Sequence, residues 1–163
     1  MDIRFETGCF EDAARVRRAV FMDEQGYEDE FDTVDKDPRC VHVTLYANGE
    51  LAGCARVFPA EAERELLSSA PVAPVCAFDG GVAPKDVYLL GRVAVLPAWR
   101  RRGLAARIVA AADDAAREAG AKLVKLHAQE YVTGLYAGQG YKPIADVDYE
   151  DEGQPHVWMA KVL

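Results

Sequence analysis

The stretch that decides the fold is Leu89-Leu90-Gly91-Arg92-Val93-Ala94-Val95-Leu96-Pro97, followed directly by Ala98-Trp99-Arg100-Arg101-Arg102-Gly103-Leu104-Ala105-Ala106. An apolar strand ends at a proline, a basic turn follows, and a helix begins at once. The first turn of a helix has backbone N–H groups without intrahelical partners, and the helix dipole adds positive charge there. Small residues at Gly103 and Ala105 would let an anion approach the main chain. The junction therefore predicts a site for a phosphate-like group.

The turn is not one of the common nucleotide-binding motifs. The chain has no G-x-x-x-x-G-K-[ST], which argues against a P-loop, and no G-x-G-x-x-G follows this strand, which argues against a dinucleotide fold. The pattern present is Arg100-x-x-Gly103-x-Ala105. An ordinary strand–helix junction on a basic surface would show the same short pattern, so the interpretation depends on the rest of the chain.

Length, charge and cysteine usage limit the classes of protein. The 163 residues suit one domain, which we expect to span 1–163, and the net charge of −8 disfavours a broad nucleic-acid surface. The apolar runs are too short to cross a bilayer and no signal peptide is visible, so we expect a cytoplasmic protein without a membrane partner. The four cysteines lie far apart, which predicts buried free thiols and no metal site.

Hydrophobic periodicity predicts the elements in order. We expect an α+β domain with a mixed β-sheet flanked by helices, in the order β-α-β-β-β-α-β-α-β-β. The acidic segment 23–37 reads as a loop or short helix outside the core, and 59–86 as a long surface excursion with a short helix near 61–67. The expected strands are 3–6, 40–47, 50–58 (a hairpin at Asn48-Gly49), 87–96 (buried on both faces), 122–128, and a final pair, 141–147 and 156–162, joined by acidic 148–153. The expected helices are 11–24, 104–119 and a short one that holds Leu135 and Tyr136.

The chain resembles the GNAT N-acetyltransferase superfamily over essentially its whole length. Arg100-x-x-Gly103-x-Ala105 resembles the motif that holds the pyrophosphate of acetyl-coenzyme A, and 135–141 resembles the family's Phe-Tyr-x-x-x-Gly-Phe segment, with Gly138 and Gln139 as departures. The likeness is greatest to the ElaA-like branch, and the 59–86 excursion looks larger than is usual there. The branch likeness rests on segments 20–26, 91–95, 127–131 and 149–156.

The resemblance implies an acyl-CoA-dependent N-acyltransferase, with acetyl-CoA as the expected donor, that transfers the acyl group from the thioester to a primary amine by direct attack. Tyr136 would then protonate the leaving thiolate. Glu24 is the preferred base, with His42, His127, Glu130 or a water chain as alternatives. The implied cofactor-binding residues are Val93, Ala94, Val95, Arg100, Arg101, Arg102, Gly103, Leu104, Ala105 and Ala106. The implied acceptor-binding residues are Gln25, Gln129 and His156.

The acceptor itself stays open: a small-molecule amine, a peptide N-terminus, a lysine side chain and an antibiotic all fit. The oligomeric state also stays open, and a homodimer is one option. The acidic segments 23–37 and 146–152 suggest the hypothesis of a negatively charged acceptor entrance that favours a cationic amine. The main alternative function is a non-catalytic acyl-CoA-binding sensor or interaction module. A nucleic-acid contact at the arginines is a third interpretation, which the overall acidity disfavours.

Overall fold

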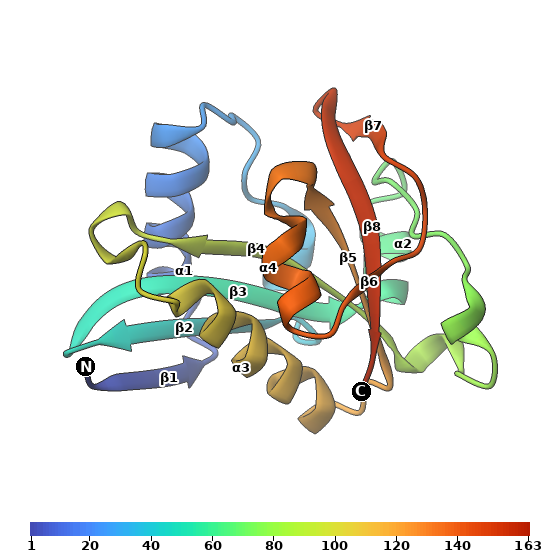
Figure 1. Ribbon diagram of the computed structural model, residues 1–163, viewed down its shortest axis with the longest axis horizontal. Coiled ribbons are helices and arrows are strands. Elements are labelled where there is room, and N and C mark those ends of the chain that lie inside the picture. Colours follow the sequence, from blue (N-terminus) through green and yellow to red (C-terminus); the bar gives the residue numbers. More distant parts are fainter.

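The computed structural model describes residues 1–163 and contains an eight-stranded mixed sheet with four α-helices (Figure 1). The strands lie in the order β1-β2-β3-β4-β5-β8-β6, and β7 pairs with β8. The strands are β1 (Ile3–Thr7), β2 (Val41–Ala47), β3 (Glu50–Pro59), β4 (Val87–Val95), β5 (Leu123–Gln129), β6 (Lys142–Pro143), β7 (Asp148–Asp151) and β8 (Gln154–Val162). The helices are α1 (Phe10–Arg17), α2 (Ala60–Leu66), α3 (Leu104–Glu118) and α4 (Thr133–Gly138). The expected α+β fold with a mixed sheet is confirmed.

Helices cover both faces of the sheet because successive residues of β3 point to opposite sides. Cys54 packs with Val16 of α1, whereas its neighbour Ala55 belongs to the larger core that contains Ile108 of α3. Gly53 permits a close approach on the α3 side, since a Cβ there would stand 2.4 Å from Cδ1 of Ile108. The long alanine-rich helix is therefore seated tightly on the middle of the sheet.

Strands β4 and β5 separate along their length, and this separation creates the site. They pair in parallel only from Val87 to Leu89 on β4 and from Leu123 to Lys125 on β5. Beyond these residues the two strands diverge (Figure 1). Leu90 is still buried, but Val93 and Val95 are only half-buried. The expectation that this strand is buried on both faces is thus wrong for its second half, because that half borders a gap instead of a partner strand.

The last part of the sheet also differs from expectation. The strand expected over 141–147 is reduced to Lys142–Pro143. Residues 148–151, expected in a joining loop, form β7 and pair with β8 through a tight turn at Glu152 and Gly153, both of which have positive φ. Strand β6 is short because Pro143 has no backbone N–H to donate to the sheet.

Near the N-terminus, the helix expected over 11–24 is α-helical only to Arg17, and residues Arg18–Glu24 continue as π-helix. The acidic segment that follows contributes to the interior, contrary to expectation, because Glu30 and Asp35 are buried against arginines. All four cysteines are free, as expected, but only Cys54 is buried. None of the helices combines the length and apolar character that crossing a bilayer requires.

Candidate active site

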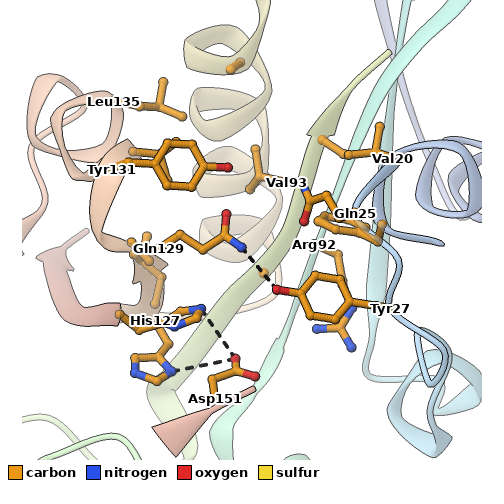
Figure 2. A pocket seen from close by; sticks show the side chains of 18 of the residues that line it. Val20, Gln25, Tyr27, Arg92, Val93, His127, Gln129, Tyr131, Leu135 and Asp151 are labelled. Carbon is orange, nitrogen blue, oxygen red and sulfur yellow. Dashed lines mark hydrogen bonds and ion pairs between the residues drawn. The ribbon is translucent and has the colours of Figure 1, made fainter. Parts of the chain in front are cut away.

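The gap between β4 and β5 opens into a pocket of about 500 Å³. One wall comes from β4 (Gly91–Val95), and the opposite wall from β5 and α4. The π-helix and the segment after it close the third side (Figure 2). Such a concave site with apolar walls and a few converging polar groups is typical of small-molecule binding.

The basic turn leaves its backbone amides without partners. Arg101 and Gly103 both adopt the left-handed region, with φ of 64° and 73°. No backbone hydrogen bond engages the amides of Arg101, Arg102 or Gly103, and no side chain caps α3. Three successive N–H groups at the N-terminus of a 15-residue helix are therefore free to donate to a ligand.

Arg100 connects the turn to both sides of the pocket. Its Nη atoms lie 2.7 and 2.6 Å from the two carboxylate oxygens of Glu24, and its Nε donates to the carbonyl oxygen of Val95 at 2.9 Å. The paired guanidinium lowers the pKa of Glu24, and the carboxylate in turn raises the pKa of Arg100. Glu24 thus lines the pocket as a carboxylate already engaged by a cation.

Strand β4 contributes three of the expected cofactor-binding residues to the pocket wall. Val93, Ala94 and Val95 all line the cavity. Immediately before them, the pairing of β3 with β4 is irregular, and Arg92 has a φ of 52°. Such a bulge re-aims the main chain next to a site. Within the 101–106 segment, Ala105 is the one residue that lines this pocket.

Tyr136 stands in the wall formed by α4. Its side chain is 9% exposed, and its ring packs edge-on against Tyr141 with centroids 6.1 Å apart. The hydroxyl makes no hydrogen bond with any protein group, although the residue lines the pocket. Burial raises the pKa of Tyr136, which keeps the phenol protonated. The side chain is thus an available proton donor.

The other expected base candidates differ in position. His127 lines the pocket, but His42 and Glu130 do not. His42 is buried on the far side of β2, where its Nε2 lies 2.9 Å from the carbonyl oxygen of Asp35 and burial lowers its pKa. Of the residues considered, only Glu24 and His127 can reach an acceptor in this cavity.

The three expected acceptor-binding residues, Gln25, Gln129 and His156, all line the same pocket. The structure adds Tyr27, whose hydroxyl lies 3.5 Å from Nε2 of Gln129 across the cavity (Figure 2). The sequence analysis missed Tyr27, because this residue stands in an acidic stretch with no periodic pattern. The available signal was its position two residues after Gln25.

The two acidic segments converge as expected. Asp29 and Glu30 from the first and Asp151 and Glu152 from the second line one cavity. Glu30 differs from the others, because it is buried and paired with Arg17 at 2.8 Å. The remaining carboxylates face no lysine or arginine within ion-pair distance, so this end of the pocket has negative potential.

A diverging strand pair, free amides at a helix N-terminus and a buried tyrosine thus meet around one pocket. The comparisons with known proteins identify the family. The model of the acetyltransferase (GNAT) family matches residues 7–141, and the chain belongs to this family. It is therefore an N-acetyltransferase, in a family that uses acyl-CoA with amine acceptors.

Individual relatives are similar over nearly their full lengths. A Bacillus subtilis (strain 168) protein provisionally named an acetyltransferase is 30% identical over 154 residues, which cover 91% of this chain and 86% of that protein. The crystal structure of Escherichia coli ElaA is similar with a TM-score of 0.72 and 22% identity over 98% of this chain and 99% of that one. An acyl-CoA N-acyltransferase from Pseudomonas aeruginosa has a TM-score of 0.73 and 20% identity, covering 99% and 100%. At these identities the two solved structures show the common fold.

Proposed function

We propose that the protein transfers an acetyl group from acetyl-CoA to a primary amine by direct attack of the amine on the thioester. The observation that carries this proposal is the adjacency of two features: the unpartnered amides of Arg101, Arg102 and Gly103, and the open edge of β4 that leads from them into the pocket. The amides through Ala106 would hold the pyrophosphate of the donor, with charge from the three arginines.

The second half of β4 would bind the peptide-like arm of the donor. Because β5 no longer pairs with this half, the edge of β4 that faces β5 is free from Val93 to Val95 to hydrogen-bond to an extended ligand, while the other edge stays paired with β3. The carbonyl of Val95 accepts from Arg100 and keeps a second lone pair for such a bond. A backbone N–H at Val93 would polarise the thioester carbonyl, an effect worth about 3 kcal/mol in acyl-transfer enzymes.

Tyr136 would donate its proton to the coenzyme A sulfur as the carbon–sulfur bond breaks. The amine must lose a proton before it attacks. Of the expected bases, Glu24 and His127 line the pocket, and a water chain would carry the proton from the reacting amine out of the cavity. The pair with Arg100 makes Glu24 a weak base, so its role in this proposal is to hold Arg100 against the turn. Gln25, Gln129 and His156 would contact the acceptor.

The experiment that tests the function is a thiol-release assay with acetyl-CoA and a library of amines. We expect amine-dependent release of free coenzyme A and a matching acetylated product by mass spectrometry. Coenzyme A binding without any amine-dependent turnover across the library would instead indicate a binding module. Absence of coenzyme A binding by calorimetry would contradict the assignment of the turn.

A further inference from the structure

The acceptor end of the pocket holds two histidines that lie against each other. His127 of β5 and His156 of β8 lie on adjacent antiparallel strands, and their ring centroids are 4.8 Å apart. Both line the pocket, although their side chains are only 9% and 6% exposed. Trp158 stacks on the other face of His127, with centroids 4.3 Å apart, so the rings are held in place.

One nitrogen of each imidazole is hydrogen-bonded to a protein oxygen, and this bond determines which nitrogen of His127 and of His156 carries the proton. Nε2 of His127 lies 3.0 Å from both carboxylate oxygens of Asp148, and Nδ1 of His156 lies 2.8 Å from the carbonyl oxygen of Gln154. Burial would raise the pKa of Asp148, but the hydrogen bonds from His127 and the Glu150 amide outweigh it and lower the pKa. A carbonyl and an ionised carboxylate can only accept, so these two ring nitrogens are the donors. In the neutral rings, the other two nitrogens are therefore acceptors.

Those two acceptor nitrogens face the same carboxylate. Oδ2 of Asp151 lies 3.9 Å from Nδ1 of His127 and 3.8 Å from Nε2 of His156 (Figure 2). Both distances are too long for a direct hydrogen bond. With both rings neutral, the two nitrogens and the Asp151 carboxylate are three acceptors that face one another with no protein donor among them. An alkylammonium group, with three N–H donors and a positive charge, has the complementary chemistry.

The charge around this point also suits a cation. Asp29 and Glu152 line the same cavity without a basic partner. Arg92 is the nearest arginine in the lining, and its guanidinium is engaged by Glu30 at 2.8 Å. An ammonium entering here would therefore meet uncompensated negative charge.

This point does not coincide with the proposed reaction centre. The parallel register pairs Leu89 with Lys125. Beyond that pair the strands diverge, and along β5 His127 comes two residues before Gln129. Two residues of extended strand span roughly 7 Å. In Figure 2 Val93 lies at one end of the pocket and His127 and Asp151 lie at the other, with the 3.5 Å contact between Tyr27 and Gln129 between them. A ligand that spans both ends therefore replaces this contact.

The geometry points to an acceptor with two primary amino groups, a linear diamine or its equivalent. One amine reacts near Val93 while the other, as an ammonium, is held by His127 Nδ1, His156 Nε2 and the Asp151 carboxylate. This inference rests on the proposed acetyl transfer, and it narrows the acceptor to a class. A monoamine of the same length would lack the second contact.

Thiol release should be measured with 1,4-diaminobutane and with 4-amino-1-butanol, which differ only in the distal group, and with diamines one carbon shorter and longer. For the best diamine we expect kcat/KM about tenfold or more above that of its amino alcohol, the worth of a charge-assisted contact. In Asp151→Asn the ratio should fall to within about threefold. Asp146→Asn removes a charge just before β7, at an exposed position outside the pocket lining, and should keep the wild-type ratio.

The outcomes separate the two proposals. An active enzyme that uses diamine and amino alcohol equally well would overturn the diamine inference and leave acetyl transfer intact. If no amine supports thiol release, the transfer proposal fails, and the ammonium site is tested directly by titrating 1,4-diaminobutane into the free protein. The imidazole ¹⁵N signals of His127 and His156 should then shift in the wild type and not in Asp151→Asn. Unchanged signals in the wild type would overturn the site.

Discussion

Tyr136 and Glu24 share one pocket, but their polar atoms have opposite surroundings. The hydroxyl of Tyr136 has no protein partner, whereas the carboxylate of Glu24 is held by both Nη atoms of Arg100. A group without a partner is available to the reacting atoms, and a group already paired is better suited to hold its neighbour in place. This difference leads to separate predictions for the two residues.

Tyr136→Phe should lower kcat by about 100-fold or more, because it removes a general acid. The dissociation constant of coenzyme A, measured by calorimetry, should stay unchanged, since the ring packing against Tyr141 is kept. Because the pKa of Tyr136 is raised, the wild-type kcat should show no loss from its deprotonation up to about pH 10. The control is Tyr131→Phe, whose phenol is exposed at the pocket rim. If Tyr131→Phe lowered kcat more than Tyr136→Phe, Tyr131 would be the proton donor instead.

Glu24→Gln should raise the KM for acetyl-CoA a few-fold and leave kcat within about threefold of wild type, since an ion pair this exposed to solvent contributes little. Arg100→Gln should raise this KM more, because it removes the pair, the bond to the Val95 carbonyl and one of the three charges proposed to attract the pyrophosphate. Steady-state kinetics from pH 5 to 9 check this. A 100-fold drop in kcat together with loss of the acidic limb of the profile would identify Glu24 as the base after all.

At the scale of elements, the conformation of the turn before α3 matters more than its charge. Gly103 has a φ of 73°, a region that costs a residue with a side chain about 1–2 kcal/mol. Gly103→Val should therefore shift the amides of the turn and weaken coenzyme A binding about tenfold by calorimetry. Gly49→Val is the matched control, because Gly49 has a φ of 82° and lies in the hairpin after β2, away from the turn. At both glycines an added Cβ would meet nothing within 4 Å. That control should lose stability but keep its affinity.

Over the whole molecule, a buried ionic network joins α1 and β3 to the segment before β2. Arg17 donates to Asp35 at 2.6 Å and to Glu30 at 2.8 Å, and Arg56 donates to Asp35 and Asp32, each at 2.8 Å. Glu30 also faces the pocket. The network therefore positions one wall of the site, and removing one member leaves buried charge without its partner.

Asp35→Asn should destabilise the protein by about 3–5 kcal/mol at pH 7, as measured by urea unfolding. Burial alone would raise the pKa of Asp35, but Arg17 and Arg56 lower it from 3.8 to about 2. A carboxyl with a depressed pKa stabilises the fold above its unfolded value and loses this contribution as the pH falls through the folded one. About 2 kcal/mol of the wild-type stability should thus disappear between pH 4 and 2, and not in the variant. Asp114→Asn, at an exposed position of α3, serves as control and should change stability by less than about 1 kcal/mol.

How far the sequence predicts each part depends on how local its cause is. The turn at 100–103, the hairpin at Asn48-Gly49 and the helix at 104–118 follow from neighbouring residues, and their positions were predicted within one or two residues. The segment 148–151 was misread as a loop, because its strand pairs only through β8. The burial of Glu30 and Asp35 could not be read from composition, since arginines 13 to 21 residues away in the chain make it favourable.

By itself, the sequence determined the order of elements apart from β7, and the strand–turn–helix junction at 89–106, because hydrophobic periodicity and helix-start chemistry operate over a few residues. The resemblance to GNAT enzymes also rested on such short segments. Only the tertiary structure decided which polar groups face one another: Glu24 with Arg100, Tyr27 with Gln129, and Asp151 with two imidazoles. Those encounters depend on where β4 leaves β5 and on the register of β8, which are set by packing between residues that are distant in the chain.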